Sequence, residues 1–184
     1  MPDSRSPSAA PTAPPHAAQP PLDARHLRDC LGHFATGVTV VTACAPDGTV
    51  AGLTVNSFNS LSLDPPLVLW SLSLRSTSLS TFEAATHFAV SVLAAGQVDL
   101  ARRFARAHAN RFAGLTVHTG LGGAPLIDGA VAWFECERRS HQRAGDHVLF
   151  IGQVRRCARD AGGQPLVFHK GRFVASVRHP DESQ

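Results

Sequence analysis

The sequence has no apolar run long enough to cross a bilayer. A membrane-spanning helix needs about 20 consecutive apolar residues, whereas the longest apolar runs of this 184-residue chain have the length of a strand and end at turn residues. The beginning of the chain also lacks the uninterrupted apolar block of a secretory signal, because prolines interrupt it. We therefore expect a soluble, cytoplasmic protein without membrane contact.

Cysteine is scarce, and its spacing matches no redox or metal motif. The four cysteines, Cys30, Cys44, Cys136 and Cys157, are scattered and form no CxxC pair. In a chain without an export signal, this pattern indicates reduced structural thiols. None of the ten histidines lies four residues from another, and the Cys and His spacing never matches a zinc site. We expect no bound metal.

Standard catalytic motifs are missing as well. The chain contains no GxxxxGK[ST] phosphate loop, no GxSxG nucleophile elbow and no HExxH metal helix. Three glycines within residues 120–123 are superficially similar to a dinucleotide fingerprint, but they do not form GxGxxG and they lead into Ala124 and Pro125 rather than into a helix. This segment is predicted to be a turn.

The charge is mildly basic and diffuse. The net charge is +3 and the sequence pI is about 9.0, but the arginines are dispersed along the chain and are not interleaved with aromatic residues. This pattern disfavours a nucleic-acid-binding barrel, an alternative that only the basic pI suggests. It suits an anionic small molecule better.

Length and composition predict one folded domain with tails. Residues 1–21 are almost entirely Pro, Ala, Ser, Thr and short polar residues, so burial cannot offset the entropy of ordering them, and we expect disorder there. The folded domain is predicted at residues 22–179, and residues 180–184 are expected to form a short C-terminal tail. The hydrophobic content of 43% supports one ordinary core.

The pattern of the domain is mainly β. Asp23 is a plausible N-cap for a helix in which Leu27, Leu31 and Phe34 share one face and which Gly37 ends. Two further helices are predicted at 76–85 and 98–107, the first with a capping box from Ser80 to Glu83 or a start two to four residues earlier. The predicted strands are 38–42, 49–55, 67–72, 87–93, 130–137, 147–157 and 165–177, the last broken at 170–171 and the first two joined by a turn at 46–48. Strands that do not alternate regularly with helices favour an antiparallel barrel with a few peripheral helices.

A dense run of small polar side chains begins at the end of the second predicted strand and continues toward the third. It comprises Thr54, Asn56, Ser57, Asn59, Ser60 and Ser62, and a second group, Ser76, Thr77, Ser78 and Ser80, begins the next helix. Polar groups near a core need partners, and a ligand is one such partner. The start of a helix also favours a phosphate. Ordinary capping and a solvated strand face explain the same residues and remain open.

One histidine stands at a strand start. His147 follows Gly145 and Asp146 and precedes an apolar strand. A lone histidine in such a place is either a catalytic or ligand-orienting group or an ordinary strand-end residue, and the sequence alone leaves both open.

Seven fragments in order resemble the flavin reductase-like family, the FMN-binding split-barrel proteins that include the small reductase components of two-component flavin monooxygenases. The fragments are residues 36–42, 52–58, 60–68, 88–93, 104–105, 145–147 and 165–166. The likeness covers about residues 22–177. It implies a Greek-key split β-barrel that forms a homodimer and binds FMN or FAD near the dimer interface.

The resemblance also implies roles for individual residues. Thr54, Val55, Asn56 and Ser57 would border the isoalloxazine ring; Ser60, Ser62 and Ser78 would serve the ribityl chain or the phosphate; Arg103 would lie near the phosphate; His147, Phe168 and Phe173 would lie on the nicotinamide side. The chain departs from the family pattern at Ser91, where many relatives have Asn, and at Phe168 and Phe173, in a region where Tyr is common.

The implied activity is reduction of FMN or FAD by NADH or NADPH, with delivery of the reduced flavin to a separate monooxygenase. In this chemistry a hydride passes directly from nicotinamide to flavin, so the protein aligns two cofactors and needs no amino-acid nucleophile. This agrees with the missing catalytic motifs. A flavin- or haem-binding protein that uses the same barrel without turnover is the alternative.

Overall fold

The structure is a computed structural model that describes residues 22–106 and 110–175. The predicted tails, 1–21 and 180–184, and the last four residues of the predicted domain lie outside the described residues. Within the described part of the chain, strands predominate as expected, and the α-helices are short.

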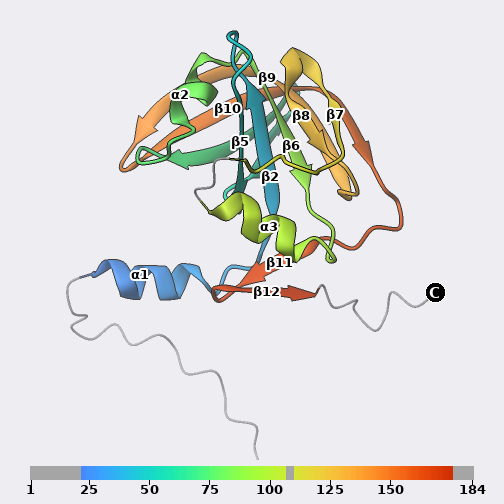
Figure 1. Ribbon diagram of the computed structural model, residues 1–184. Helices are drawn as coiled ribbons and strands as arrows, with labels where there is room; N and C mark the ends of the chain where they lie inside the picture. The colour runs from blue at the N-terminus through green and yellow to red at the C-terminus, as the bar shows by residue number, and fades with distance from the viewer. Residues whose placement is uncertain (1–21, 107–109, 176–184) are drawn as a thin grey trace, which may run out of the picture.

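A seven-stranded antiparallel sheet forms the body of the molecule (Figure 1). Its strands in chain order are β2 (Thr39–Cys44), β3 (Val50–Val55), β4 (Asn59–Leu63), β5 (Pro66–Ser73), β6 (His87–Val92), β9 (Ala132–Ala144) and β10 (His147–Arg159). Across the sheet they follow the order β3-β2-β6-β9-β10-β5-β4. The predicted hairpin of β2 and β3 is confirmed, and its turn is fixed by Asp47, whose carboxylate accepts the Thr49 N–H at 2.9 Å, which lowers the pKa of Asp47.

The sheet curls until two strands far apart in its order meet. Ser57, just after β3, hydrogen-bonds to the backbone of Ser71 in β5, although β2, β6, β9 and β10 separate these strands in the sheet. One core cluster also combines Val55 of β3 with Trp70 of β5. Because β3 and β5 share no strand ladder, the barrel stays open between them.

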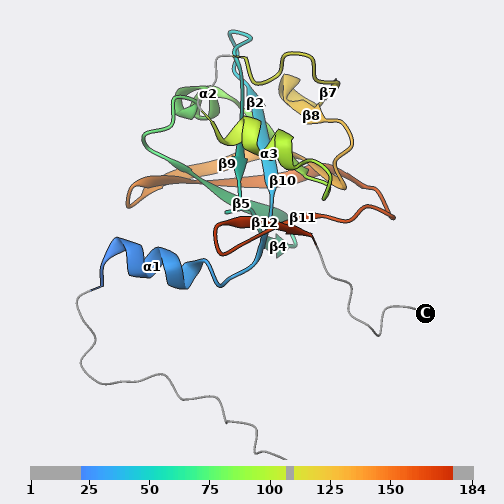
Figure 2. The same ribbon diagram turned by 60° about the horizontal axis from the view of Figure 1, so that its bottom comes forward.

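Smaller elements surround the barrel. The strands β1 (Thr36–Gly37), β11 (Leu166–His169) and β12 (Arg172–Ala175) form one small sheet, and β7 (Val117–Thr119) pairs with β8 (Pro125–Ile127). The helices are α1 (Ala24–Leu31), α2 (Leu79–Ala84) and α3 (Val98–Ala105), and the predicted turn at 120–123 contains a single 3-10 turn, η1 (Leu121–Gly123). Helix α3 packs on β3 and β2, whereas α1 projects away from the barrel in both views (Figures 1 and 2).

Two apolar clusters hold these elements together. In the barrel, the fully buried Trp70 stacks on Phe150 with 4.7 Å between ring centroids and contacts Phe82 of α2 edge-on. In the second cluster, Phe104 of α3 packs with Val40 of β2 and Leu166 of β11. The second cluster fixes α3 against the sheet, beside the barrel opening.

Several predicted boundaries were wrong. Helix α1 begins after the Asp23 N-cap as predicted, but it ends at Leu31 rather than at Gly37. Phe34 therefore lies outside the helix, and Gly37 pairs with β11 as part of β1. The physical reason is a tertiary contact: the Gly32 carbonyl accepts the Lys170 N–H from the β11–β12 turn at 2.8 Å.

The second helix shows a similar shift. The predicted capping box does not form, because Ser80 and Glu83 both lie inside α2 and Ser78 is the N-cap. The earlier start that the sequence left open is the one observed. Strand β4 was not predicted, since three of its five residues are polar and it lies at the edge of the sheet. Strand β9 continues to Ala144 instead of ending at Glu137, as the polar arm of a hairpin with β10.

Candidate functional site

A groove follows the opening of the barrel. Two adjoining hollows of about 270 and 210 Å³ share Leu53, Thr54 and Ser76 and therefore form one continuous groove. The first hollow is lined further by Val55, Asn56, Ser57, Ser71, Leu72, Ser73 and His147. The second is lined further by Arg75, Thr77, Phe104, Ala105 and Arg111. The groove thus runs from a histidine at one end to two arginines at the other.

Backbone donors of β3 face this groove. Strand β3 is an edge strand, paired only with β2 in the sheet. The Gly52 carbonyl points away from β2, since it accepts a hydrogen bond from Arg111. In an antiparallel strand, the peptide groups of alternate residues point to the same side. The N–H groups of Thr54 and Asn56 therefore point outward from the free edge, into the opening.

Two hydroxyls of the predicted polar run form hydrogen bonds between the elements that line the groove. Thr54 Oγ1 donates to the Ala101 carbonyl of α3 at 2.8 Å. Ser57 Oγ accepts the Ser71 N–H at 3.0 Å and lies 3.2 Å from the Ser71 carbonyl, to which it donates. These side chains join β3 to α3 and to β5. The Asn56 side chain, by contrast, is exposed at the groove wall.

Arg111 is the main residue of the groove that the sequence did not reveal. Its Nη1 donates to the Gly52 carbonyl and lies 3.5 Å from Ser78 Oγ, and its Nε donates to the Arg106 carbonyl at 2.9 Å. The guanidinium is therefore held in place by three partners while it lines the groove. With the exposed Arg75, it gives this end of the groove two positive charges beside the hydroxyls of Ser76 and Thr77. Such a set of donors matches a phosphate.

His147 closes the other end. Its Nδ1 lies 2.7 Å from Asp146 Oδ1, and this hydrogen bond lowers the pKa of Asp146. The carboxylate accepts, so Nδ1 carries a proton and Nε2 is left for a bound molecule. Strand β10 begins at His147 and pairs with Ser73 of β5 there, so the ring is positioned by the sheet and by its acidic neighbour.

The remaining predicted site residues lie in four other places. Ser78 is buried at the start of α2 and reaches the groove through Arg111. Arg103 of α3 donates to the carbonyls of Asn110 and Ala113, and these hydrogen bonds attach the segment that carries Arg111 to α3. Ser60 and Ser62 lie on the edge strand β4, and neither lines the groove.

Phe168 and Phe173 face each other across the β11–β12 hairpin, with 5.5 Å between ring centroids. Both pack on the cluster around Phe104. Ser91, where the chain departs from the family pattern, is fully buried in β6 and accepts the Ile127 N–H at 3.1 Å. Its hydroxyl therefore supports β8 and does not line the groove.

The described residues contain neither a metal-binding cluster nor a membrane-spanning helix. Residues 22–106 and 110–175 contain no group of three or more His, Cys, Asp or Glu side chains arranged to hold a metal ion. No helix in the same part of the chain has the length and apolar character needed to span a membrane.

Comparison with known proteins gives consistent matches. Residues 31–176 match the flavin reductase like domain. The FMN reductase (NADH) SmoA of Agrobacterium fabrum is 49% identical over 82% of this chain and 85% of that protein. The reductase component of the flavin-dependent trigonelline monooxygenase of Acinetobacter baylyi is 45% identical over 84% of this chain, which spans 49% of that relative.

Solved structures agree with this match. The NADH:FAD oxidoreductase SgcE6 of Streptomyces globisporus, in complex with NAD and FAD fragments, is 41% identical and superimposes with a TM-score of 0.79 over 86% of this chain and 94% of that one. The fold is a split barrel, as the sequence fragments implied. The chain belongs to the flavin reductase-like family.

Proposed function

We propose that this protein is an NADH-dependent flavin reductase that reduces FMN or FAD and supplies the reduced flavin to a separate monooxygenase component. The observation that carries the proposal is the groove at the barrel opening, with His147 at one end and Arg75 and Arg111 at the other. The relatives support it, because they are named as reductases of this kind. The reaction takes place in the cytoplasm in this proposal.

The residues present fit a flavin. The stretch from Thr54 to Ser57 supplies apolar contact from Val55 and outward N–H groups at the edge of β3, which would border the ring and stabilise negative charge on it. Arg111, Arg75 and the hydroxyls of Ser76 and Thr77 would hold the phosphate. When bound, the flavin supplies the acceptor for the nicotinamide hydride.

Five other predicted residues have supporting roles in this proposal. Ser78 orients Arg111, and Arg103 anchors the segment that carries Arg111. His147 lies on the nicotinamide side and orients the donor through Nε2. The family resemblance implies a place on that side for Phe168 and Phe173 as well, whereas within one chain both rings pack on the cluster around Phe104, which lines the arginine end of the groove.

The direct test is to mix purified protein with NADH and either FMN or FAD and to follow the loss of NADH absorbance. We expect steady turnover that depends on added flavin. NADPH in place of NADH identifies the preferred donor. A protein that binds flavin but never oxidises either nicotinamide would contradict the proposal.

Replacing His147 with alanine is expected to raise the KM for NADH by about tenfold, the size of one lost hydrogen bond to a charged or polar group. The Kd for flavin, measured by fluorescence quenching, should stay within about twofold of the wild-type value. His118→Ala is a matched control, because His118 is exposed and pairs with Asp128 outside the groove. Equal steady-state kinetics for His147→Ala and wild type would remove His147 from the site.

The protein is a homodimer in this proposal. Helix α1 has no buried residue, and Leu31 and Phe34 are 63% and 73% exposed. An isolated helix of 8 residues is unstable in water, so its apolar face needs a partner surface. Leu61 and Leu63 on the edge strand β4 form a second exposed apolar patch, with Leu63 92% exposed. A two-fold related copy can cover both patches.

Light scattering tests the dimer. We expect the wild-type mass to be twice the subunit mass of 19.5 kDa, and the double variant Leu31→Ser/Phe34→Ser to be largely monomeric. Asp29→Ser is the control, since it changes the polar part of the same helix. A wild-type protein that is monomeric at micromolar concentration would refute the dimer.

A further inference from the structure

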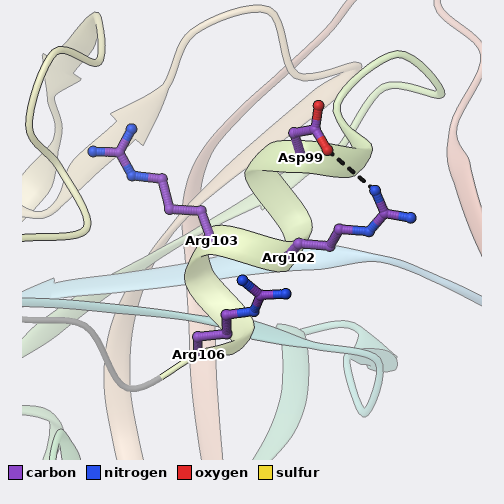
Figure 3. A pocket seen from close by; sticks show the side chains of 4 residues that line it. All are labelled: Asp99, Arg102, Arg103 and Arg106. Atoms are coloured by element: carbon purple, nitrogen blue, oxygen red, sulfur yellow. Dashed lines mark hydrogen bonds and ion pairs between the residues drawn. The ribbon is translucent and has the colours of Figure 1, made fainter.

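A second groove lies on the solvent side of α3. Its volume is about 400 Å³, and it is lined by Asp99, Arg102, Arg103 and Arg106 (Figure 3). The lining therefore includes three arginines and one aspartate among the described residues. Such an excess of positive charge at the surface attracts an anion.

The three arginines are not equivalent. Arg102 pairs with Asp99 at 3.2 Å, but both side chains are largely exposed, so this pair is weak. Arg103 extends away from the other two (Figure 3) and donates to backbone carbonyls of residues 110 and 113. Arg102 lies in the last turn of α3, and Arg106 is the C-cap, with an extended backbone. Both line this groove, so their like charges repel each other across it. A bound anion would relieve that repulsion.

This groove adjoins the phosphate end of the barrel groove. Ala105 of α3 lines the barrel groove, and its neighbour Arg106 lines the second groove. The Arg106 carbonyl accepts a 2.9 Å hydrogen bond from Nε of Arg111, the arginine at the phosphate end. A ligand that extends past Arg111 therefore meets the exposed side of α3.

We propose that the arginine groove of α3, formed by Arg102 and Arg106, binds the adenylate phosphate of FAD and makes the protein prefer FAD to FMN. This inference rests on the proposed flavin reductase function. FMN ends at its single phosphate, whereas FAD continues through a second phosphate to adenosine. The monoester of FMN carries nearly two negative charges, and the diphosphate of FAD carries a similar total. The two ligands therefore differ at this groove in length rather than in net charge, because FAD extends to Arg102 and Arg106 in this proposal and FMN does not.

The test compares wild type with the double variant Arg102→Ala/Arg106→Ala by quenching of flavin fluorescence. We expect the Kd for FAD to rise about tenfold, the sum of two exposed charge pairs. The Kd for FMN should change by less than about twofold. Asp99→Asn should have the opposite effect and lower the Kd for FAD, because it removes the one carboxylate among the described residues that line the groove.

Arg159→Ala is the control for the change in net charge, since Arg159 is exposed at the far end of β10. Equal weakening of FMN and FAD by the double variant would refute the subsite. So would a rise in the KM for NADPH with an unchanged Kd for FAD, which would assign the arginines to the nicotinamide donor. A wild-type protein that binds neither flavin would instead refute the proposed function, so the two failures are distinguishable.

Discussion

Replacing Arg111 with alanine is expected to raise the Kd for both FMN and FAD by roughly 10- to 100-fold, the range for a hydrogen bond to a charged group. Arg111 would contact the phosphate that both flavins share. The substitution also removes the hydrogen bonds that tie Arg111 to the carbonyls of Gly52 and Arg106. The measurement is flavin fluorescence quenching at low and high salt, because a phosphate contact weakens as salt screens it.

Arg111→Lys separates charge from geometry. Lysine keeps the positive charge but cannot reproduce a guanidinium that bridges two carbonyls and a hydroxyl. The Kd of Arg111→Lys for each flavin should therefore lie between the values of Arg111→Ala and wild type. Arg156→Ala, an exposed arginine that pairs weakly with Glu135 at 4.0 Å, is the remote control. If Arg111→Ala binds both flavins as wild type does while its Tm falls, Arg111 is a structural residue only.

The contrast between Arg111 and the α3 arginines is itself informative. Loss of Arg111 should weaken both flavins, whereas loss of Arg102 and Arg106 should weaken FAD alone. The structure explains this expected difference, because Arg111 lines the groove at the barrel opening and Arg106 lines the adjoining one. The two variants therefore separate binding of the shared phosphate from binding of the second.

Local sequence patterns predicted the parts of the fold that local chemistry determines. The β2–β3 hairpin follows from a β-branched run and a turn with Asp47 and Gly48, where Gly48 adopts a φ of 85°. The start of α1 follows from Asp23, whose carboxylate accepts the His26 N–H at 2.7 Å. In both cases the residues that determine the structure are only a few positions apart.

The missed features depend on contacts between distant residues. Arg111 lies in a segment with no motif and enters the groove through a contact with Gly52, 59 positions away in the chain. The end of α1 is fixed by the β11–β12 turn. Strand β4 has the composition of a polar loop and becomes a strand only because β5 offers it an edge. No local pattern encodes such partners.

The candidate site was predicted in part. Thr54, Asn56 and Ser57 of the polar run do line one groove with His147, whereas Ser60 and Ser62 lie outside it on β4. The hydroxyls of Thr54 and Ser57 bond to α3 and β5. The many hydroxyl residues in this stretch therefore indicated a place where secondary-structure elements are joined as much as a binding surface. The donors that face the opening are backbone N–H groups of β3, whose direction depends on strand pairing rather than on residue type.

Gly52→Ala is expected to destabilise the protein and weaken flavin binding together. A Cβ at this buried position would lie 2.7 Å from Cζ of Phe112 and 2.8 Å from Cε1 of Phe104. Phe104 is itself buried in the second core cluster, so its ring cannot move freely away. Overpacking of this kind costs about 1–3 kcal/mol, and each kcal/mol lowers the Tm by about 2–4 °C in a domain of this size.

Flavin binding should weaken for the same reason. Phe112 is next to Arg111 in the chain, and the Gly52 carbonyl accepts a hydrogen bond from Arg111, so a shift at Gly52 also moves Arg111. We expect the Kd for FMN to rise several-fold in Gly52→Ala. Gly37→Ala is the matched control, since a Cβ there meets no atom within 4 Å. Phe112→Leu in the Gly52→Ala background should recover part of the lost Tm, because it removes the ring edge that the new methyl group strikes. A double variant no more stable than Gly52→Ala would show that the collision with Phe104, deeper in the core, sets the cost.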